Sequence, residues 1–124
     1  MSTPEIYQVN IHHAVSAGNV LLTELLIAKA GGEVNTPNED GVALLHLASA
    51  HGHVEVVNIL IQAGGDFNKK TGDGWTPLHL ATHNGQVEVI TALLAAGADK
   101  KLKDKWGSTP HDVAENQATR NALK

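Results

Sequence analysis

The chain of 124 residues contains no cysteine. This absence excludes disulfide bonds, thiolate metal ligands and a cysteine nucleophile. Aromatic side chains are scarce as well, since the sequence has two tryptophans, one tyrosine and one phenylalanine. Any hydrophobic core must therefore be built mainly from leucine, isoleucine, valine and alanine.

Membrane-spanning and secretory segments are also lacking. No apolar run approaches the roughly 20 residues that a membrane-spanning helix requires. The first ten residues, "MSTPEIYQVN", contain neither the basic nor the apolar segment of a signal peptide. We therefore expect an intracellular protein, cytoplasmic or nuclear, that does not contact a membrane.

A concentrated basic face is missing too, and the net charge is −4. Residues 1–62 carry six acidic side chains and one basic one, a net charge of −5. Residues 63–124 carry seven acidic and eight basic side chains, a net charge of +1. This positive balance is too weak for a nucleic-acid-binding protein. The asymmetry is sufficient, however, to steer a charged protein partner.

What the sequence does contain is an internal repeat. Residues 40–56 read "DGVALLHLASAHGHVEV", and residues 73–89 read "DGWTPLHLATHNGQVEV", which is a shift of 33 positions. A further shift of 33 leads to "GSTPHDVA" in the last part of the chain, whereas the offset is 34 upstream of Gly52. We expect one domain with repeats at about 4–37, 38–70, 71–103 and 104–124, the first and last of which cap the array.

Each repeat is predicted to form a helix, a turn, a second helix and a loop. Thr76 has the hydroxyl of a helix N-cap, Pro77 suits the first helical position, and Gly85 suits the end of the helix. The next segment, "QVEVITALLAAG", places apolar residues at helical spacing. One such helix pair cannot bury its apolar stripe alone, so stacked pairs forming a solenoid are expected.

The period, the start "DGWTPLHLA", the second helix "QVEVI" and the ending "AGAD" closely resemble ankyrin repeats. The resemblance covers nearly the whole chain. It implies an all-α solenoid of stacked helix-turn-helix pairs with β-hairpin fingers, and a concave face formed by the fingers and the first helices. It also implies a protein–protein interaction module, an adaptor or inhibitor that binds another protein. We expect this molecule to be a monomer.

Three segments depart from the family pattern. The second repeat has Ala43 and Leu44 where threonine and proline are expected, and the loss of the hydroxyl cap costs about 1 kcal/mol. The fourth repeat has His111 and Asp112 in place of leucine and histidine, and its last helix is only the polar tail "NQATRNALK". At the other end, "STPE" resembles a capping box that opens an extended first helix over residues 4–17.

Catalytic, cofactor and metal sites are not expected. His79 and His83 are four residues apart on a predicted helix, as two metal ligands could be, but no third ligand has a fixed spacing. His79 and His46 instead match the family's structural histidine, which hydrogen-bonds near the hairpin. The stretch "GGDFNKKTGDG" lacks the glycine before Lys-Thr and the preceding strand that a phosphate-binding loop needs. We therefore predict that the protein is not an enzyme.

The tryptophans are the strongest candidates for a binding function. The resemblance places Trp75 on the concave side, next to the turn glycine, and Trp106 at a fingertip. Tryptophan is enriched at interface hot spots. Alternatively, Trp75 packs against its own hairpin and Trp106 folds over the last repeat. Further interface candidates occupy the family's variable positions: Asp40, Val42, His51, Lys70, Asp73, His83, Asn84, Lys103 and Lys105.

These positions grade from acidic to basic along the chain. We hypothesise a partner segment with an apolar anchor flanked by carboxylates at the basic end. The alternative is that the lysines of "KKLKDKW" belong to an ordinary solvated loop. Asn35 and Asn68 resemble the loop asparagine that an asparaginyl hydroxylase can modify in ankyrin repeats, and a structural role in the hairpin is expected for both.

Three narrower identities stay open at this point. The C-terminal 28 residues, ending in "NQATRNALK", look similar to the end of myotrophin-like proteins, four-repeat ankyrin proteins that bind actin-capping protein and inhibit it. A host-directed effector of a bacterium or parasite is a second possibility. The third is a structural segment of a larger repeat array, against which the polar C-terminal end argues.

Overall fold

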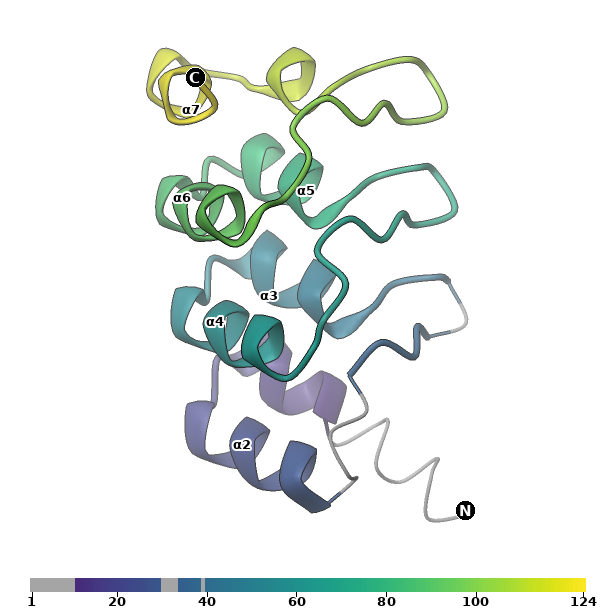
Figure 1. Cartoon of the computed structure of the whole chain (residues 1–124), viewed down its shortest axis with the longest axis vertical. Helices are drawn as coiled ribbons and strands as arrows, with labels where there is room; N and C mark the ends of the chain where they lie inside the picture. Colours follow the sequence, from purple (N-terminus) through teal and green to yellow (C-terminus); the bar gives the residue numbers. More distant parts are fainter. Residues whose placement is uncertain (1–10, 30–33, 39) are drawn as a thin grey trace.

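A computed structural model describes residues 11–29, 34–38 and 40–124. Of the predicted first helix, residues 11–17 are helical, and residues 4–10 with the proposed capping box lie outside the described residues. The helices form antiparallel pairs that stack in chain order (Figure 1). Their bounds are α2 Val20–Lys29, α3 Leu44–His51, α4 Val54–Gln62, α5 Pro77–His83, α6 Val87–Ala96, the 3₁₀ turn η1 His111–Val113, and α7 Gln117–Ala122.

The N-terminal caps form as the sequence predicts. Thr76 accepts a hydrogen bond from the backbone N–H of His79 at 3.3 Å, and Pro77 occupies the first turn of α5. Ala43 precedes α3 and provides no side-chain cap. In its place, Nδ1 of His46 accepts the backbone N–H of Ala43 at 3.0 Å. At the start of both α3 and α5, one backbone N–H that has no carbonyl partner within the helix is therefore bonded by a histidine ring.

Glycines allow the sharp turn between the two helices of a pair. Gly52 and Gly85 have φ values of 77° and 70°, a left-handed conformation that most L-residues adopt only with strain. Their backbone N–H groups donate to carbonyls of the preceding helix, those of Ser49 and Thr82. The first helix of each pair therefore ends where the sequence predicts.

The core is aliphatic. Ala48 of α3 and Ala81 of α5 are fully buried, and their small side chains let these neighbouring first helices pack closely. The second helices contribute Leu60 and Leu93, which are also fully buried. Burying such a side chain stabilises the fold by about 2 kcal/mol. The two tryptophans are not part of this core.

The expected β-hairpin fingers are only partly correct. Loops project from the stack at the starts of the second, third and fourth repeats (Figure 1), but no β-strand occurs in the described part of the chain. We call residues 38–42, 71–75 and 104–108 fingers 2, 3 and 4. Each finger is closed by two backbone hydrogen bonds of 2.8–3.0 Å. Two bonds close a tight loop but do not make the longer ladder of a paired strand.

The last repeat is shortened, as predicted. Its first helix is reduced to the 3₁₀ turn η1, in which Asp112 accepts the backbone N–H of Thr109 at 2.9 Å. Helix α7 is capped by Asn116, which accepts the backbone N–H of Thr119 at 2.8 Å. Leu123 is buried, and α7 packs on α6. Its remaining residues are mostly polar and exposed, which suits the end of a solenoid.

Candidate protein-binding face

Two buried histidines position the fingers. Nε2 of His46 donates to the carbonyl oxygens of Lys69 at 2.8 Å and Trp75 at 3.1 Å, and Nε2 of His79 donates to that of Ser108 at 2.9 Å. Because Nδ1 of each ring accepts a backbone N–H, both rings are neutral. Burial lowers the pKa of both histidines below the ordinary value of 6.5. The predicted structural role of this motif histidine is confirmed.

The first residue of each finger holds the loop with its side chain. In finger 2, the Asn38 side-chain oxygen accepts the backbone N–H groups of Asp40 and Val42 at 2.9 and 3.0 Å. In finger 4, Oδ1 of Asp104 accepts those of Trp106 and Ser108, both at 2.9 Å. The Thr71 hydroxyl accepts the N–H of Trp75 at 3.3 Å in finger 3. These three residues lie 33 positions apart, and each bonds the backbone of its own finger.

Sequence reasoning missed this role. The signal was present, because positions 38, 71 and 104 all carry a short side chain with an oxygen acceptor directly before the fingertip. Such residues form turns by bonding the backbone two residues further on.

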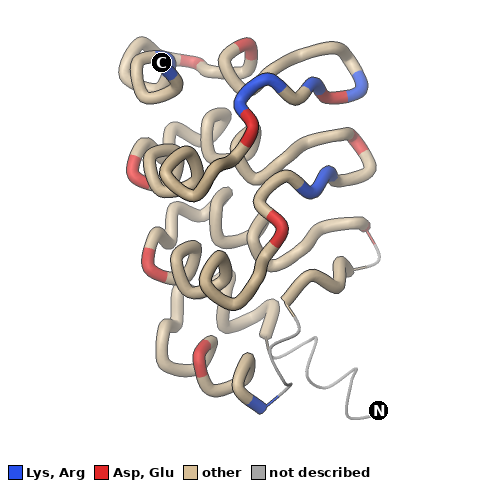
Figure 2. Tube along the Cα trace, viewed as in Figure 1, with Lys and Arg blue, Asp and Glu red and all other residues tan. Residues whose placement is uncertain are grey.

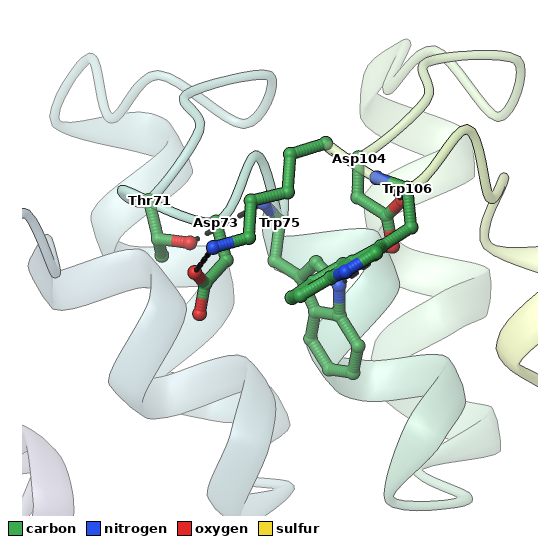
Figure 3. A network of polar contacts seen from close by, with 6 residues as sticks. Thr71, Asp73, Trp75, Asp104 and Trp106 are labelled. Carbon is green, nitrogen blue, oxygen red and sulfur yellow. Dashed lines mark hydrogen bonds and ion pairs between the residues drawn. The ribbon is translucent and has the colours of Figure 1, made fainter.

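Trp75 is half-buried and held from several sides. Its indole Nε1 donates to Oδ2 of Asp104 in finger 4 at 2.9 Å (Figure 3). Its ring stacks on that of His79 with centroids 5.9 Å apart, and the ring of His83 meets it edge-on at 5.3 Å. The indole therefore packs on α5 and on the next finger, and not only against its own hairpin. A side chain fixed in this way loses little conformational freedom on binding a partner.

Asp104 is a buried carboxylate at the centre of this network, with 8% of its surface exposed. Burial alone would raise its pKa, but hydrogen bonds from Ser108, the Trp75 indole and Trp106 outweigh burial and lower the pKa below 3.8. The carboxylate is therefore ionised at neutral pH, and both of its oxygens are used inside the protein.

Fingers 3 and 4 are joined by further contacts. Nζ of Lys105 lies 2.8 Å from a carboxylate oxygen of Asp73, and its backbone N–H donates to the Asp73 carbonyl at 3.0 Å. Nζ of Lys70 donates to the carbonyl of Lys103 at 2.9 Å. All four side chains remain exposed. Together with the Trp75–Asp104 bond, these contacts tie finger 3 to finger 4.

Trp106 is presented differently. Its side chain is 66% exposed at the tip of finger 4, and the ammonium of Lys105 lies 4.6 Å from the ring centroid. The ring therefore does not fold over the last repeat, which was the alternative to an exposed position.

A groove of about 410 Å³ opens between finger 2 and finger 3. Trp75 forms part of its wall, and Val42 and Asp73 lie at its edge together with Asp40. The first helices also supply Leu47 and Leu80, which sequence reasoning did not single out. The complete lining is Asp40, Val42, His46, Leu47, Ala50, Thr71, Gly72, Asp73, Trp75 and Leu80.

The remaining predicted face residues lie near the ends of the first helices. His83 is exposed and its Nδ1 lies 3.5 Å from a Glu115 carboxylate oxygen. Asn84 is exposed and donates to the carbonyl of Ala50 at 3.2 Å. His51 is exposed and its ring stacks on that of His53. These side chains already make contacts within the stack, and none of the three lines the groove.

Asn35 and Asn68 have the structural role that we expected. Asn35 donates to the carbonyl of Gly64 at 3.0 Å and accepts the N–H of Asp66 at 2.7 Å. Asn68 accepts the N–H of Asp99 at 2.9 Å. Each asparagine therefore ties one interrepeat loop to the next.

A search for other kinds of site covers only the described residues. Within residues 11–29, 34–38 and 40–124, no group of three or more metal-ligating side chains comes together. In the same ranges, no helix has the length and apolar character to cross a membrane.

Stacked helix pairs with projecting fingers and an open groove are the features of a helical repeat solenoid. A family model described as ankyrin repeats, in three copies, matches residues 11–104, and the chain belongs to this family. Ankyrin repeats imply protein–protein interaction, and proteins built from them are typically non-enzymatic binding modules.

Among curated proteins, the chain is similar to the Notch-regulated ankyrin repeat-containing proteins of Homo sapiens, Mus musculus and Xenopus tropicalis. Each is 38% identical over 50 residues, which cover 40% of this chain and 43% of the relative. The chain thus matches less than half the length of these relatives. The expected likeness to myotrophin is wrong, because the similarity found is to this other ankyrin protein.

Proposed function

We propose that the protein is an adaptor or inhibitor that binds a protein partner on the face formed by the fingers and the first helices. The observation that carries this proposal is the groove of about 410 Å³ with Trp75 in its wall. A partly exposed indole beside an apolar depression is typical of interface hot spots. We propose further that the protein acts as a monomer, in the cytoplasm or nucleus.

Trp75 is the proposed central anchor, with Trp106 as a second aromatic contact. The bond from Trp75 to Asp104 holds the indole in one orientation before any partner arrives. The exposed Trp106 ring contributes area at the tip of finger 4. Flanking contacts are proposed for the other residues of the face: Asp40, Val42, His51, Lys70, Asp73, His83, Asn84, Lys103 and Lys105.

Affinity capture from cells, followed by mass spectrometry, tests this function. A Trp75→Ala/Trp106→Ala variant should lose the partner, with its affinity reduced about tenfold or more. Ala50→Arg should also lose it, because the long side chain fills the groove while Trp75 and its contacts stay in place. The matched control is Glu88→Ala/Thr91→Ala on α6, where both residues are exposed.

Circular dichroism and thermal unfolding establish that each variant is folded before capture. Proteins retained by the α6 variant and lost by both face variants support the proposal. If every captured protein binds Ala50→Arg as well as it binds the parent, the face is not the binding surface.

A further inference from the structure

The proposed binding face carries charges of opposite sign at its two ends. In a solenoid, order along the chain is order in space (Figure 1). Of the described residues, Glu24, Lys29, Asp40 and Glu55 carry a net charge of −2 and therefore lie toward one end of the stack, whereas residues 63–124 carry +1 and lie toward the other. Figure 2 shows that most of the basic residues gather at fingers 3 and 4 and in the loops that lead to them.

Only some charges of the face are available to a partner. Asp73 and Lys105 neutralise each other across 2.8 Å. Asp104 is buried and its oxygens accept internal hydrogen bonds. Of the charged side chains of the proposed face that the structure describes, those that are exposed and outside an ion pair are the carboxylate of Asp40, on the finger 2 side of the groove, and the ammonium groups of Lys70 and Lys103, on the finger 4 side.

Between these charges lies the apolar part of the groove. Val42 and Ala50 contribute from the second repeat, and Trp75 and Leu80 contribute from the third. At finger 2 the position equivalent to Trp75 is Val42, whose smaller side chain leaves the space open. The same space between fingers 3 and 4 is bridged by the indole and its bond to Asp104.

From this juxtaposition we infer that the partner presents a linear segment of fixed polarity, with a basic residue, an apolar anchor and acidic residues in that order. The anchor enters the groove beside Trp75, the basic residue lies near Asp40, and the carboxylates lie near Lys70 and Lys103. The inference rests on the proposed function and adds the chemistry and direction of the ligand. Charge placed in this way selects among apolar segments, because a reversed segment would bring like charges together.

Selection of random linear peptides on the purified full chain tests the inference without a known partner. We expect enriched peptides to carry an aromatic or aliphatic residue with aspartate or glutamate on one side and lysine or arginine on the other. A fluorescein-labelled consensus peptide and the same peptide with its charges exchanged would then be compared by fluorescence anisotropy. The exchanged peptide should bind about tenfold more weakly, with the difference shrinking at high salt.

Charge reversal on the protein provides the complementary arm. Lys70→Glu/Lys103→Glu should weaken the consensus peptide about tenfold and favour the exchanged one. Lys103→Glu alone keeps the test independent of the bond that Lys70 makes. The control Lys29→Glu/Lys124→Glu changes the net charge by the same amount, with one substitution in the first repeat and one in the last. It should leave the affinities for the consensus peptide and the exchanged peptide unchanged.

Two results would overturn the inference. One is a set of peptides that compete for the groove, as shown by loss with Ala50→Arg, but carry no consistent charge order. The other is a selection without enrichment, which would exclude recognition of a linear segment. Neither result decides the proposed function, because capture of folded partners by the face variants is measured separately.

Discussion

At the scale of single residues, the bond between Trp75 and Asp104 links two repeats. The donor and acceptor are 29 positions apart in the chain and 2.9 Å apart in space. Asp104 at the same time accepts backbone N–H groups within finger 4. A residue proposed for binding therefore also contributes to folding, so stability and affinity must be measured separately for each tryptophan variant.

Replacing Trp75 should destabilise the protein in a graded way. Trp75→Ala should lower the free energy of unfolding by about 2 kcal/mol, because the half-buried ring makes fewer contacts than a core tryptophan, whose loss costs roughly 3–5 kcal/mol. Trp75→Phe keeps ring contacts with His79 and His83 but lacks the N–H donor, so its stability should fall between those of the parent and Trp75→Ala. Urea unfolding followed by far-ultraviolet circular dichroism measures both changes.

Trp106→Phe is the matched control for this series. Its ring is 66% exposed, and among the described residues its indole N–H has no hydrogen-bond acceptor. The free energy of unfolding should therefore stay within about 0.5 kcal/mol of the parent. A Trp75→Phe variant as stable as Trp106→Phe would show that the bond to Asp104 does not stabilise the fold.

At the scale of the helix, α3 and α5 begin almost identically but differ in one cap. Thr76 provides a hydroxyl to α5, whereas Ala43 provides none to α3. Ala43→Thr should raise the free energy of unfolding by about 1 kcal/mol, and Thr76→Ala should lower it by about the same amount. Chemical denaturation measures this pair of opposite effects. If both variants leave the denaturation midpoint unchanged, these hydroxyl caps do not contribute to the stability of the stack.

The helices were predictable from the sequence because the repeat makes every local signal recur. The cap at Thr76, the turn at Gly85 and the apolar spacing of α6 all follow from short-range rules. The shape of the fingers was less predictable, because two hydrogen bonds or a longer ladder are equally compatible with a glycine-containing loop. The Trp75–Asp104 contact was not predictable at all, since it depends on how one repeat stacks on the next.

The binding face was predictable only in outline. The variable positions identified Val42, Asp73 and Trp75, which line the groove, but they also included His83 and Asn84, which make contacts within the stack. Leu47 and Leu80 were missed because they belong to the apolar pattern of the first helices, and that pattern alone does not distinguish a groove from a core. Their place in the groove depends on the small side chain of Val42.

At the scale of the whole molecule, neutral histidines connect each repeat to the next. His46 joins α3 to finger 3, and His79 joins α5 to finger 4. Burial lowers the pKa of both rings, whereas in the unfolded chain they titrate near 6.5. Below that pH the unfolded state binds more protons than the folded state, so the free energy of unfolding must decrease as the pH falls.

This linkage predicts full histidine-dependent stability above about pH 6.5 and a progressive loss as the pH falls below that value. Asp104 and Asp112 titrate in a different pH range from the histidines. Because the pKa values of these two carboxyl groups are lowered, the stability that they contribute is lost only below about pH 3.8. Urea unfolding at several pH values measures the slope. His46→Gln should reduce this slope, because it removes one of the two rings whose pKa burial lowers. Stability that is constant from pH 7 to pH 5 in the parent would contradict this linkage, because the two rings would then bind protons as readily in the folded stack as in the unfolded chain.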